Sequence, residues 1–173
     1  MQGAESRICL SCLGGSKIMN VPVNIVKPIA DVLKRYCAFT YYQQSILCIL
    51  DEEEDSNFVS VLKDAGFLVD CIPIKDFYAL TVFDVLEYDY LVGNCNNSFN
   101  SKFFLKFIAL AKPFAMFTDI RLRTDLNYIK LIANNKAEQL FVYVDDEEGS
   151  SSYGGTYICK NLFRDTLNMV EVK

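Results

Sequence analysis

Histidine and tryptophan are absent from this 173-residue sequence. Histidine is the side chain that most often transfers protons at neutral pH, so its absence argues against general acid–base catalysis of the usual kind. A cysteine or serine nucleophile would also lack the histidine that commonly activates it. A carboxylate pair such as Asp51 with Asp119, each at the end of an expected strand, is the alternative left open. From these absences we expect a protein that is not an enzyme.

Long hydrophobic runs are also missing. No apolar stretch approaches the ~20 residues that span a bilayer, and the N-terminus lacks a charged start followed by an apolar segment. We therefore expect a soluble, non-secreted protein with no membrane partner. The net charge of -5 argues against nucleic acid as the main ligand, because such binding depends on clustered Lys and Arg.

Seven cysteines, an odd number, are spread along the chain at positions 9, 12, 37, 48, 71, 95 and 159. Most lie inside apolar runs, which is typical of reduced, buried cysteines in the cytosol or nucleus. Cys9 and Cys12 form a CxxC motif, but a zinc site needs about four ligands and the sequence has no histidine and no second CxxC. We expect no metal, no cofactor and no disulfide that folding requires.

Apolar residues alternate between strand-like and helix-like spacing along the chain. The pattern predicts helices at residues 23–37, 76–87, 99–111 and 118–135, and one that begins in the acidic run 51–56 and stops at Gly66. It predicts strands at residues 7–13, 45–50, 67–74, 90–92, 112–117, 139–144 and 156–159. This order indicates an α/β fold with a mainly parallel sheet of four or more strands and helices on both faces.

Residues 88–118 are the most informative part of the sequence, because they predict a complete strand, helix, strand unit. The helix has a broad apolar face made by Phe104, Leu105, Ile108, Leu110 and Ala111. We expect this unit to place five side chains in the core: Tyr90, Leu91, Leu105, Ile108 and Phe114.

Ligands of parallel sheets usually bind beyond the carboxyl ends of the strands. One such end is the turn at residues 14–16, which could cradle a phosphate but lacks the spaced glycines of a dinucleotide site and the GK[ST] of a P-loop. Another is the acidic run 51–55, which could bind magnesium. A tight turn and a solvated helix start are the commoner explanations of these two segments.

Four segments follow one another between residues 45 and 135: ILCIL at 46–50, LKDAGF at 62–67, DYLV at 89–92 and LKFIALAKP at 105–113. Together they resemble a BRCT domain. The run VLEYDYLV at 85–92 is similar to the second repeat in checkpoint mediator proteins of the DNA-damage response. The resemblance implies a BRCT-like unit at 45–135, after an extension or degenerate repeat at 1–44. It leaves 136–173 as a strand, an acidic loop and a hairpin packed on the same domain.

What the resemblance implies is a non-enzymatic scaffold that binds a protein or phosphopeptide partner near chromatin. The expected location is nuclear, with the cytoplasm as second choice, and a homodimer is left open. The residues that would hold a phosphate are cations near the start of the helix after residue 97 and in the segment after the final strand: Lys102, Lys106, Arg121 and Arg123. If residues 1–44 form a degenerate preceding repeat, Ser11 and Gly14 would also contribute.

Two departures accompany the resemblance. BRCT domains usually carry a tryptophan after the final strand, and here none exists. Asp51 and Glu52 follow the first strand, where they would repel a phosphate. The same residues also resemble a receiver domain in which Asn94 replaces the phosphoacceptor aspartate and Thr118 follows a later strand. A degenerate receiver and a small doubly wound α/β enzyme are therefore the alternative hypotheses.

Overall fold

A computed structural model of the chain describes residues 21–37, 42–50, 56–94, 101–119, 125–145, 152–162 and 167–172. The expected strand at 7–13 and the turn at 14–16 lie outside these residues. The described helices are α1 (Val23–Cys37), α2 (Ser56–Asp64), α3 (Ile74–Phe77), α4 (Ser101–Ala109) and α5 (Leu126–Asn134). The strands are β1 (Ser45–Leu50), β2 (Leu68–Pro73), β3 (Tyr90–Asn94), β4 (Phe114–Asp119), β5 (Glu138–Asp145), β6 (Ser152–Lys160) and β7 (Leu167–Val172). Among the described helices, none is long and apolar enough to cross a membrane.

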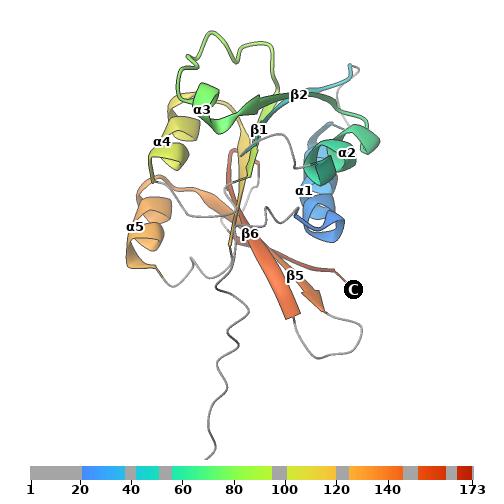
Figure 1. The fold of residues 1–173 in the computed structure, drawn as a ribbon. Helices are drawn as coiled ribbons and strands as arrows, with labels where there is room; N and C mark the ends of the chain where they lie inside the picture. The colour runs from blue at the N-terminus through green and yellow to red at the C-terminus, as the bar shows by residue number, and fades with distance from the viewer. Residues whose placement is uncertain are drawn as a thin grey trace, which may run out of the picture.

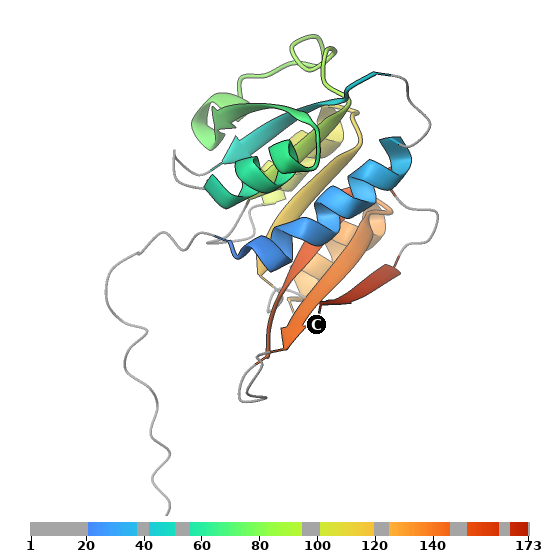
Figure 2. The ribbon, with the colours of Figure 1, turned by 90° about the vertical axis from the view of Figure 1, so that its right-hand side faces the viewer.

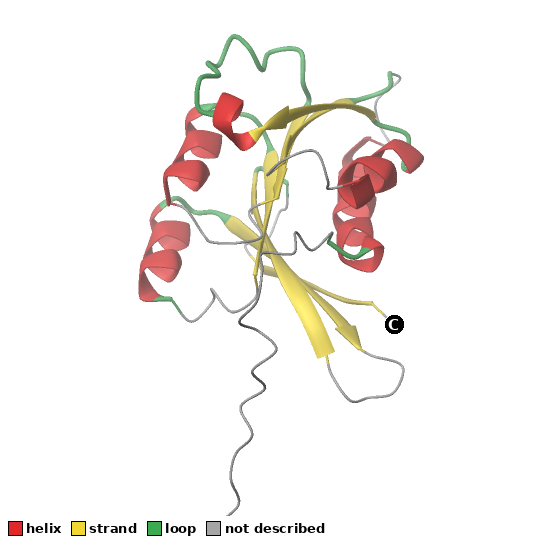
Figure 3. Ribbon diagram, in the orientation of Figure 1, coloured by secondary structure: helices red, strands yellow, loops and turns green. Residues whose placement is uncertain are grey.

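All the described strands form one seven-stranded sheet in the order β2-β1-β3-β4-β6-β5-β7. Strand β6 runs antiparallel to both of its neighbours, and every other pair in the sheet is parallel. Helices α1 and α2 cover one face, while α3, α4 and α5 cover the other (Figures 1 and 3). The α/β class and the mainly parallel sheet with helices on both faces are thus confirmed.

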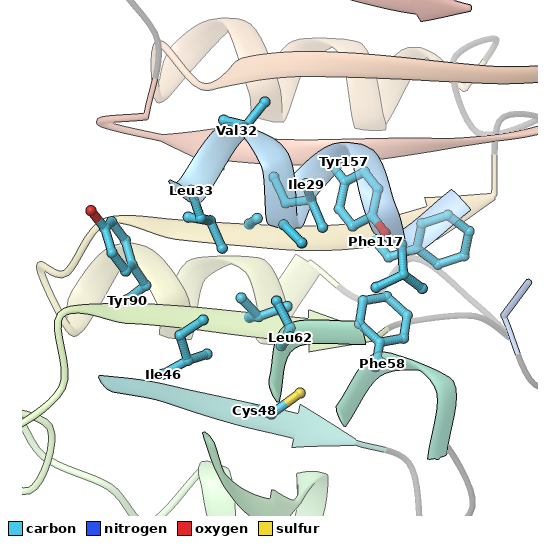
Figure 4. Close-up of a cluster of buried hydrophobic side chains, with 14 of the residues drawn as sticks. Ile29, Val32, Leu33, Ile46, Cys48, Phe58, Leu62, Tyr90, Phe117 and Tyr157 are labelled. Carbon is cyan, nitrogen blue, oxygen red and sulfur yellow. The ribbon is translucent and has the colours of Figure 1, made fainter. Parts of the chain in front are cut away.

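Successive side chains of a strand point to opposite faces, and this alternation divides the core in two. On β1, Ile46, Cys48 and Leu50 pack under α1 and α2, whereas Leu47 and Ile49 pack on the opposite side. We call the first cluster the α1/α2 core; Figure 4 shows part of it, and Figure 2 shows α1 lying across this face. The second cluster contains the buried side chains of α4 and α5, and we call it the α4/α5 core. Both faces are therefore closed by apolar packing.

Helix α5 begins later than the sequence pattern predicts. The expected start at Thr118 or Asp119 is wrong, because both residues belong to β4. The helix starts at Leu126, where the Asp125 carboxylate accepts hydrogen bonds from the backbone N–H groups of Asn127 (2.7 Å) and Tyr128 (3.1 Å). An aspartate at this position satisfies donors that the first helical turn leaves without partners.

The helix expected at residues 76–87 is also wrong. Only the short α3 forms, and a series of tight turns follows it up to Tyr88. The Asp84 carboxylate accepts from both the backbone N–H and the hydroxyl of Thr81, at 2.6 Å each. This side-chain bonding competes with helical backbone bonds and fixes a turn instead. The turns leave Phe83 82% exposed, so the segment buries little of its apolar surface.

The apolar face of α4 is rotated relative to the expected one. Tyr90, Leu91 and Phe114 are buried as predicted, but Leu105 is 45% exposed and Ile108 is half-buried. Phe104 is buried as part of the expected face, and Phe103 and Phe107 fill the α4/α5 core in place of Leu105 and Ile108. Three aromatic rings on one helix bury more apolar area than the aliphatic stripe could, which explains the rotation.

Gly155 on β6 leaves room for the ring of Phe117 on β4, and its replacement has a predictable cost. A Cβ atom there would collide with the ring of Phe117, which Phe58 and Tyr157 hold in place from two sides. We expect Gly155→Ala to lower the free energy of unfolding by about 1–3 kcal/mol through overpacking. Urea denaturation measures this change.

Gly66→Ala is the control for that substitution. Gly66 ends α2 with φ +100°, and a Cβ atom added there would meet no other atom within 4 Å, so only backbone strain opposes alanine. The expected loss is about 1 kcal/mol. A smaller loss in Gly155→Ala than in Gly66→Ala would contradict the packing role assigned to Gly155.

Candidate functional site

The carboxyl edge of the sheet contains its switch point. From β1 the chain crosses to β2 on one side, and it then returns to β3 on the other side of β1. When the crossovers from two neighbouring strands run in opposite directions, the loops at the carboxyl ends of those strands move apart and leave a crevice. Ligands of doubly wound sheets bind in this crevice. This edge, beyond Leu50, Asn94 and Asp119, is therefore the candidate site.

Buried polar side chains concentrate at the same edge. Five polar residues are buried among the described ones. Asn94 and Thr118 lie at the ends of β3 and β4, and Thr156 on β6 is the register partner of Thr118. Asn94 is 3% exposed and Thr118 is fully buried. Because burying polar groups costs free energy, their retention in an otherwise apolar core is typical of a functional position.

Thr118 belongs to a polar network that fixes the end of β4. Its hydroxyl has one proton, which it donates either to the backbone carbonyl of Thr156 (3.3 Å) or to the Tyr128 hydroxyl. Tyr128 in turn donates to the Oε1 atom of Gln139 (3.3 Å). Burial raises the pKa of Tyr128 to about 12, so its hydroxyl keeps its proton at physiological pH and remains a donor. The network joins α5 to β4, β5 and β6.

Gly93 precedes Asn94 at the end of β3, but it does not form a cradle for a ligand. A Cβ atom at Gly93 would lie 2.6 Å from the ring of Phe107 and 3.4 Å from that of Phe103. The glycine therefore serves the close packing of α4 against β3. On this side of the edge the space is filled by the protein's own aromatic rings.

Most of the residues proposed from the sequence for phosphate binding lie outside the described part of the structure. Ser11, Gly14, Arg121 and Arg123 lie outside it, as does Asp51 of the carboxylate pair. Lys102 is exposed in the first turn of α4. The other α4 candidate, Lys106, donates to the backbone carbonyl of Leu80 and so anchors the turns after α3. These assignments are untested by the structure.

The described residues do not form a metal site. Within the described ranges, no three His, Cys, Asp or Glu side chains are grouped so that they could hold a metal ion. The acidic run 51–55 that suggested magnesium lies outside those ranges.

No protein-family model matches the chain, and no curated protein sequence matches it. Similar solved structures include phosphoethanolamine N-methyltransferase 2 from Haemonchus contortus with S-adenosyl-L-methionine (TM-score 0.44, 12% identity, 81% of this chain and 38% of that one). A release-factor-specific protein-(glutamine-N5) methyltransferase from Alicyclobacillus acidocaldarius has a TM-score of 0.40 at 10% identity, over 80% of this chain and 93% of that one. A predicted O-methyltransferase from Agrobacterium tumefaciens has a TM-score of 0.44 at 4% identity, over 87% of this chain and 85% of that one.

These values limit the similarity to the general α/β arrangement, and the chain spans about 38% of the length of the Haemonchus enzyme. What the chain itself shows is a mostly parallel α/β sheet with helices on both faces.

The resemblance to BRCT domains is wrong. The structural matches described above are methyltransferases, and the sheet does not end after four parallel strands but continues through β6, β5 and β7. The expectation of a non-enzymatic phosphopeptide scaffold of the DNA-damage response is overturned with it. The alternative of a small α/β enzyme agrees better with these findings. The resemblance misled because it rested on short segments within residues 45–135, whereas the same sheet also includes β5, β6 and β7.

Proposed function

We propose that this chain is an enzyme that transfers a methyl group from S-adenosylmethionine, bound at the carboxyl edge of β1, β3 and β4. The observation that carries the proposal is the strand order, in which antiparallel β6 is inserted between the parallel strands β4 and β5. This arrangement is typical of Rossmann-like methyltransferases. It supports a ligand at the switch point between β1 and β3.

Methyl transfer is compatible with a chain that has no histidine. Its reactants are a positively charged sulfonium and a nucleophile, and holding the two in line supplies much of the acceleration. A proton-transferring imidazole is not required when the acceptor is already nucleophilic. The sequence excludes the commonest acid–base chemistry, and that exclusion does not extend to this reaction class.

Charge and polarity at the carboxyl edge also fit such a cofactor. The described strand ends offer the neutral amide of Asn94 and the hydroxyl of Thr118, which suit the uncharged hydrogen-bonding groups of a nucleoside. The five residues after β1 in the sequence, 51–55, are all acidic and lie outside the described part. Negative charge attracts a sulfonium and repels a phosphate. Both features favour S-adenosylmethionine over a phosphate-bearing nucleotide.

The chain's own residues would bind S-adenosylmethionine and orient it. When bound, S-adenosylmethionine supplies an electrophilic methyl group. The side-chain amide of Asn94 can both donate and accept at the end of β3. Thr118, through its bond with the Thr156 carbonyl on the neighbouring strand, keeps the end of β4 in one conformation. A rigid edge of this kind positions reactants without reorganisation.

Isothermal titration calorimetry of the full chain tests this proposal. We expect S-adenosylmethionine and S-adenosylhomocysteine to bind with a dissociation constant in the micromolar range, about −8 kcal/mol, and ATP and NAD to bind far more weakly. Binding of ATP with equal or higher affinity, or no binding of either sulfur nucleoside, would contradict the proposed function.

A further inference from the structure

Two cysteines face each other across strands β1 and β2. Cys48 and Cys71 are direct register partners in this parallel pair. Cys48 belongs to the α1/α2 core, and Val69, two residues before Cys71, packs against the same core. Alternation along the strand therefore places both thiols on one face of the sheet. Neighbouring strands lie about 4.8 Å apart, which is within the Cα separation of about 4.4–6.8 Å that a disulfide spans.

The two thiols differ in their surroundings. Cys71 is exposed and Cys48 is buried. The pKa of Cys71 is lowered to about 7, chiefly by a hydrogen bond from the Cys48 side chain and further by the charge of Lys63, while burial and Asp70 act in the opposite direction. A partly exposed thiol with this degree of ionisation is typical of reactive cysteines. A second thiol beside it is typical of redox-sensitive pairs.

We propose that Cys71 and Cys48 form a peroxide-reactive pair, in which Cys71 is oxidised first and Cys48 then closes a disulfide between β1 and β2. The Cys71 thiolate attacks hydrogen peroxide, an S–O bond forms, the O–O bond breaks, and the departing hydroxide takes a proton to become water. The sulfur loses two electrons to the peroxide. The Cys48 sulfur next attacks the sulfenic acid, an S–S bond replaces the S–O bond, and water leaves with the Cys48 proton.

The expected gain in reactivity is moderate. At pH 7 about half of the Cys71 side chains are thiolate, against about 1% for a thiol at the ordinary value of 9.0. The lower basicity of the thiolate offsets about eightfold of this gain. We therefore expect Cys71 to react about sixfold faster than an ordinary exposed thiol. Cys159 provides an internal control, because it is fully buried and burial raises its pKa well above the ordinary value.

Peptide mapping of the folded full chain tests the pair. Trypsin places Cys48 in residues 36–63 and Cys71 in residues 64–75, and Cys37→Ser removes the other cysteine of the first peptide. In this background, hydrogen peroxide followed by alkylation should join the two peptides through a disulfide and leave Cys159 modifiable only after denaturation. Adding Cys48→Ala should leave a sulfenic acid on Cys71 that dimedone traps. Adding Cys71→Ser should leave Cys48 reduced.

The pH dependence of alkylation gives a second readout. The rate at Cys71 should rise with pH through a midpoint near 7 as the thiolate forms, and Cys48→Ala should move that midpoint towards 9.0. An unchanged midpoint in the Cys48→Ala variant would overturn the proposal that the two cysteines act as a pair. So would a stable sulfenic acid on Cys71 while Cys48 is present, or oxidation of Cys71 no faster than that of Cys159 in the folded protein.

Discussion

Replacing Phe107 by alanine should lower the free energy of unfolding by about 3–5 kcal/mol, the range for removing a buried aromatic ring. The ring is fully buried in the α4/α5 core. Its centroid lies 4.7 Å from that of Phe77 and 5.0 Å from those of Phe103 and Phe114. Three neighbouring rings thus lose contacts at once, and the cavity cannot close by moving one side chain. Urea denaturation followed by circular dichroism measures the change.

Leu105→Ala on the same helix is the matched control. Leu105 is 45% exposed, so its truncation should change the free energy of unfolding by no more than about 0.5 kcal/mol. A loss at Leu105 comparable to that at Phe107 would mean that α4 presents the aliphatic face that the sequence suggested, rather than the aromatic one.

Replacing Asn94 by alanine should weaken the binding of S-adenosylmethionine by about 5- to 150-fold. This range corresponds to the loss of about 1–3 kcal/mol when a buried polar group loses its partner. Asn94 is the buried amide at the carboxyl end of β3, next to the switch point. Calorimetric titration of the variant measures the change, and thermal unfolding shows whether the variant remains folded.

Gln44→Ala is the control for Asn94. Gln44 is also a buried amide, at 7% exposure, but it precedes β1 at the amino edge of the sheet. Its loss should affect stability and leave the affinity for S-adenosylmethionine unchanged. If both variants lose affinity equally, the effect is a general one on folding and Asn94 has no direct role in binding.

Much of the fold was predictable because its strongest signals are local. The apolar spacing of α1 and the buried run of β1 gave these elements their observed bounds. The turns after α3 were missed because the Thr81 and Asp84 pair overrides a helix-like pattern. The face of α4 was missed because the competition between Leu105 and Phe107 for the core is decided by tertiary packing.

The candidate site was less predictable, since it depends on which strands become neighbours. In the sequence, Asn94 follows a predicted strand and stands in the phosphoacceptor position of a receiver-like pattern, but nothing local marks it as buried beside the switch point. The insertion of β6 between β4 and β5 pairs residues nearly 40 positions apart, as in the bond from Thr118 to Thr156. Cys48 and Cys71 likewise become partners only through the register of β1 and β2.

Hydrogen–deuterium exchange with and without S-adenosylmethionine tests the central claim most directly, because it reports both binding and location. The account predicts slower exchange in peptides that cover the carboxyl ends of β1, β3 and β4, including Asn94 and Thr118. Peptides at the amino edge, around Gln44 and Asp89, should be unchanged. Protection confined to the amino edge, or no protection at saturating cofactor, would contradict a methyl-donor site at the carboxyl edge.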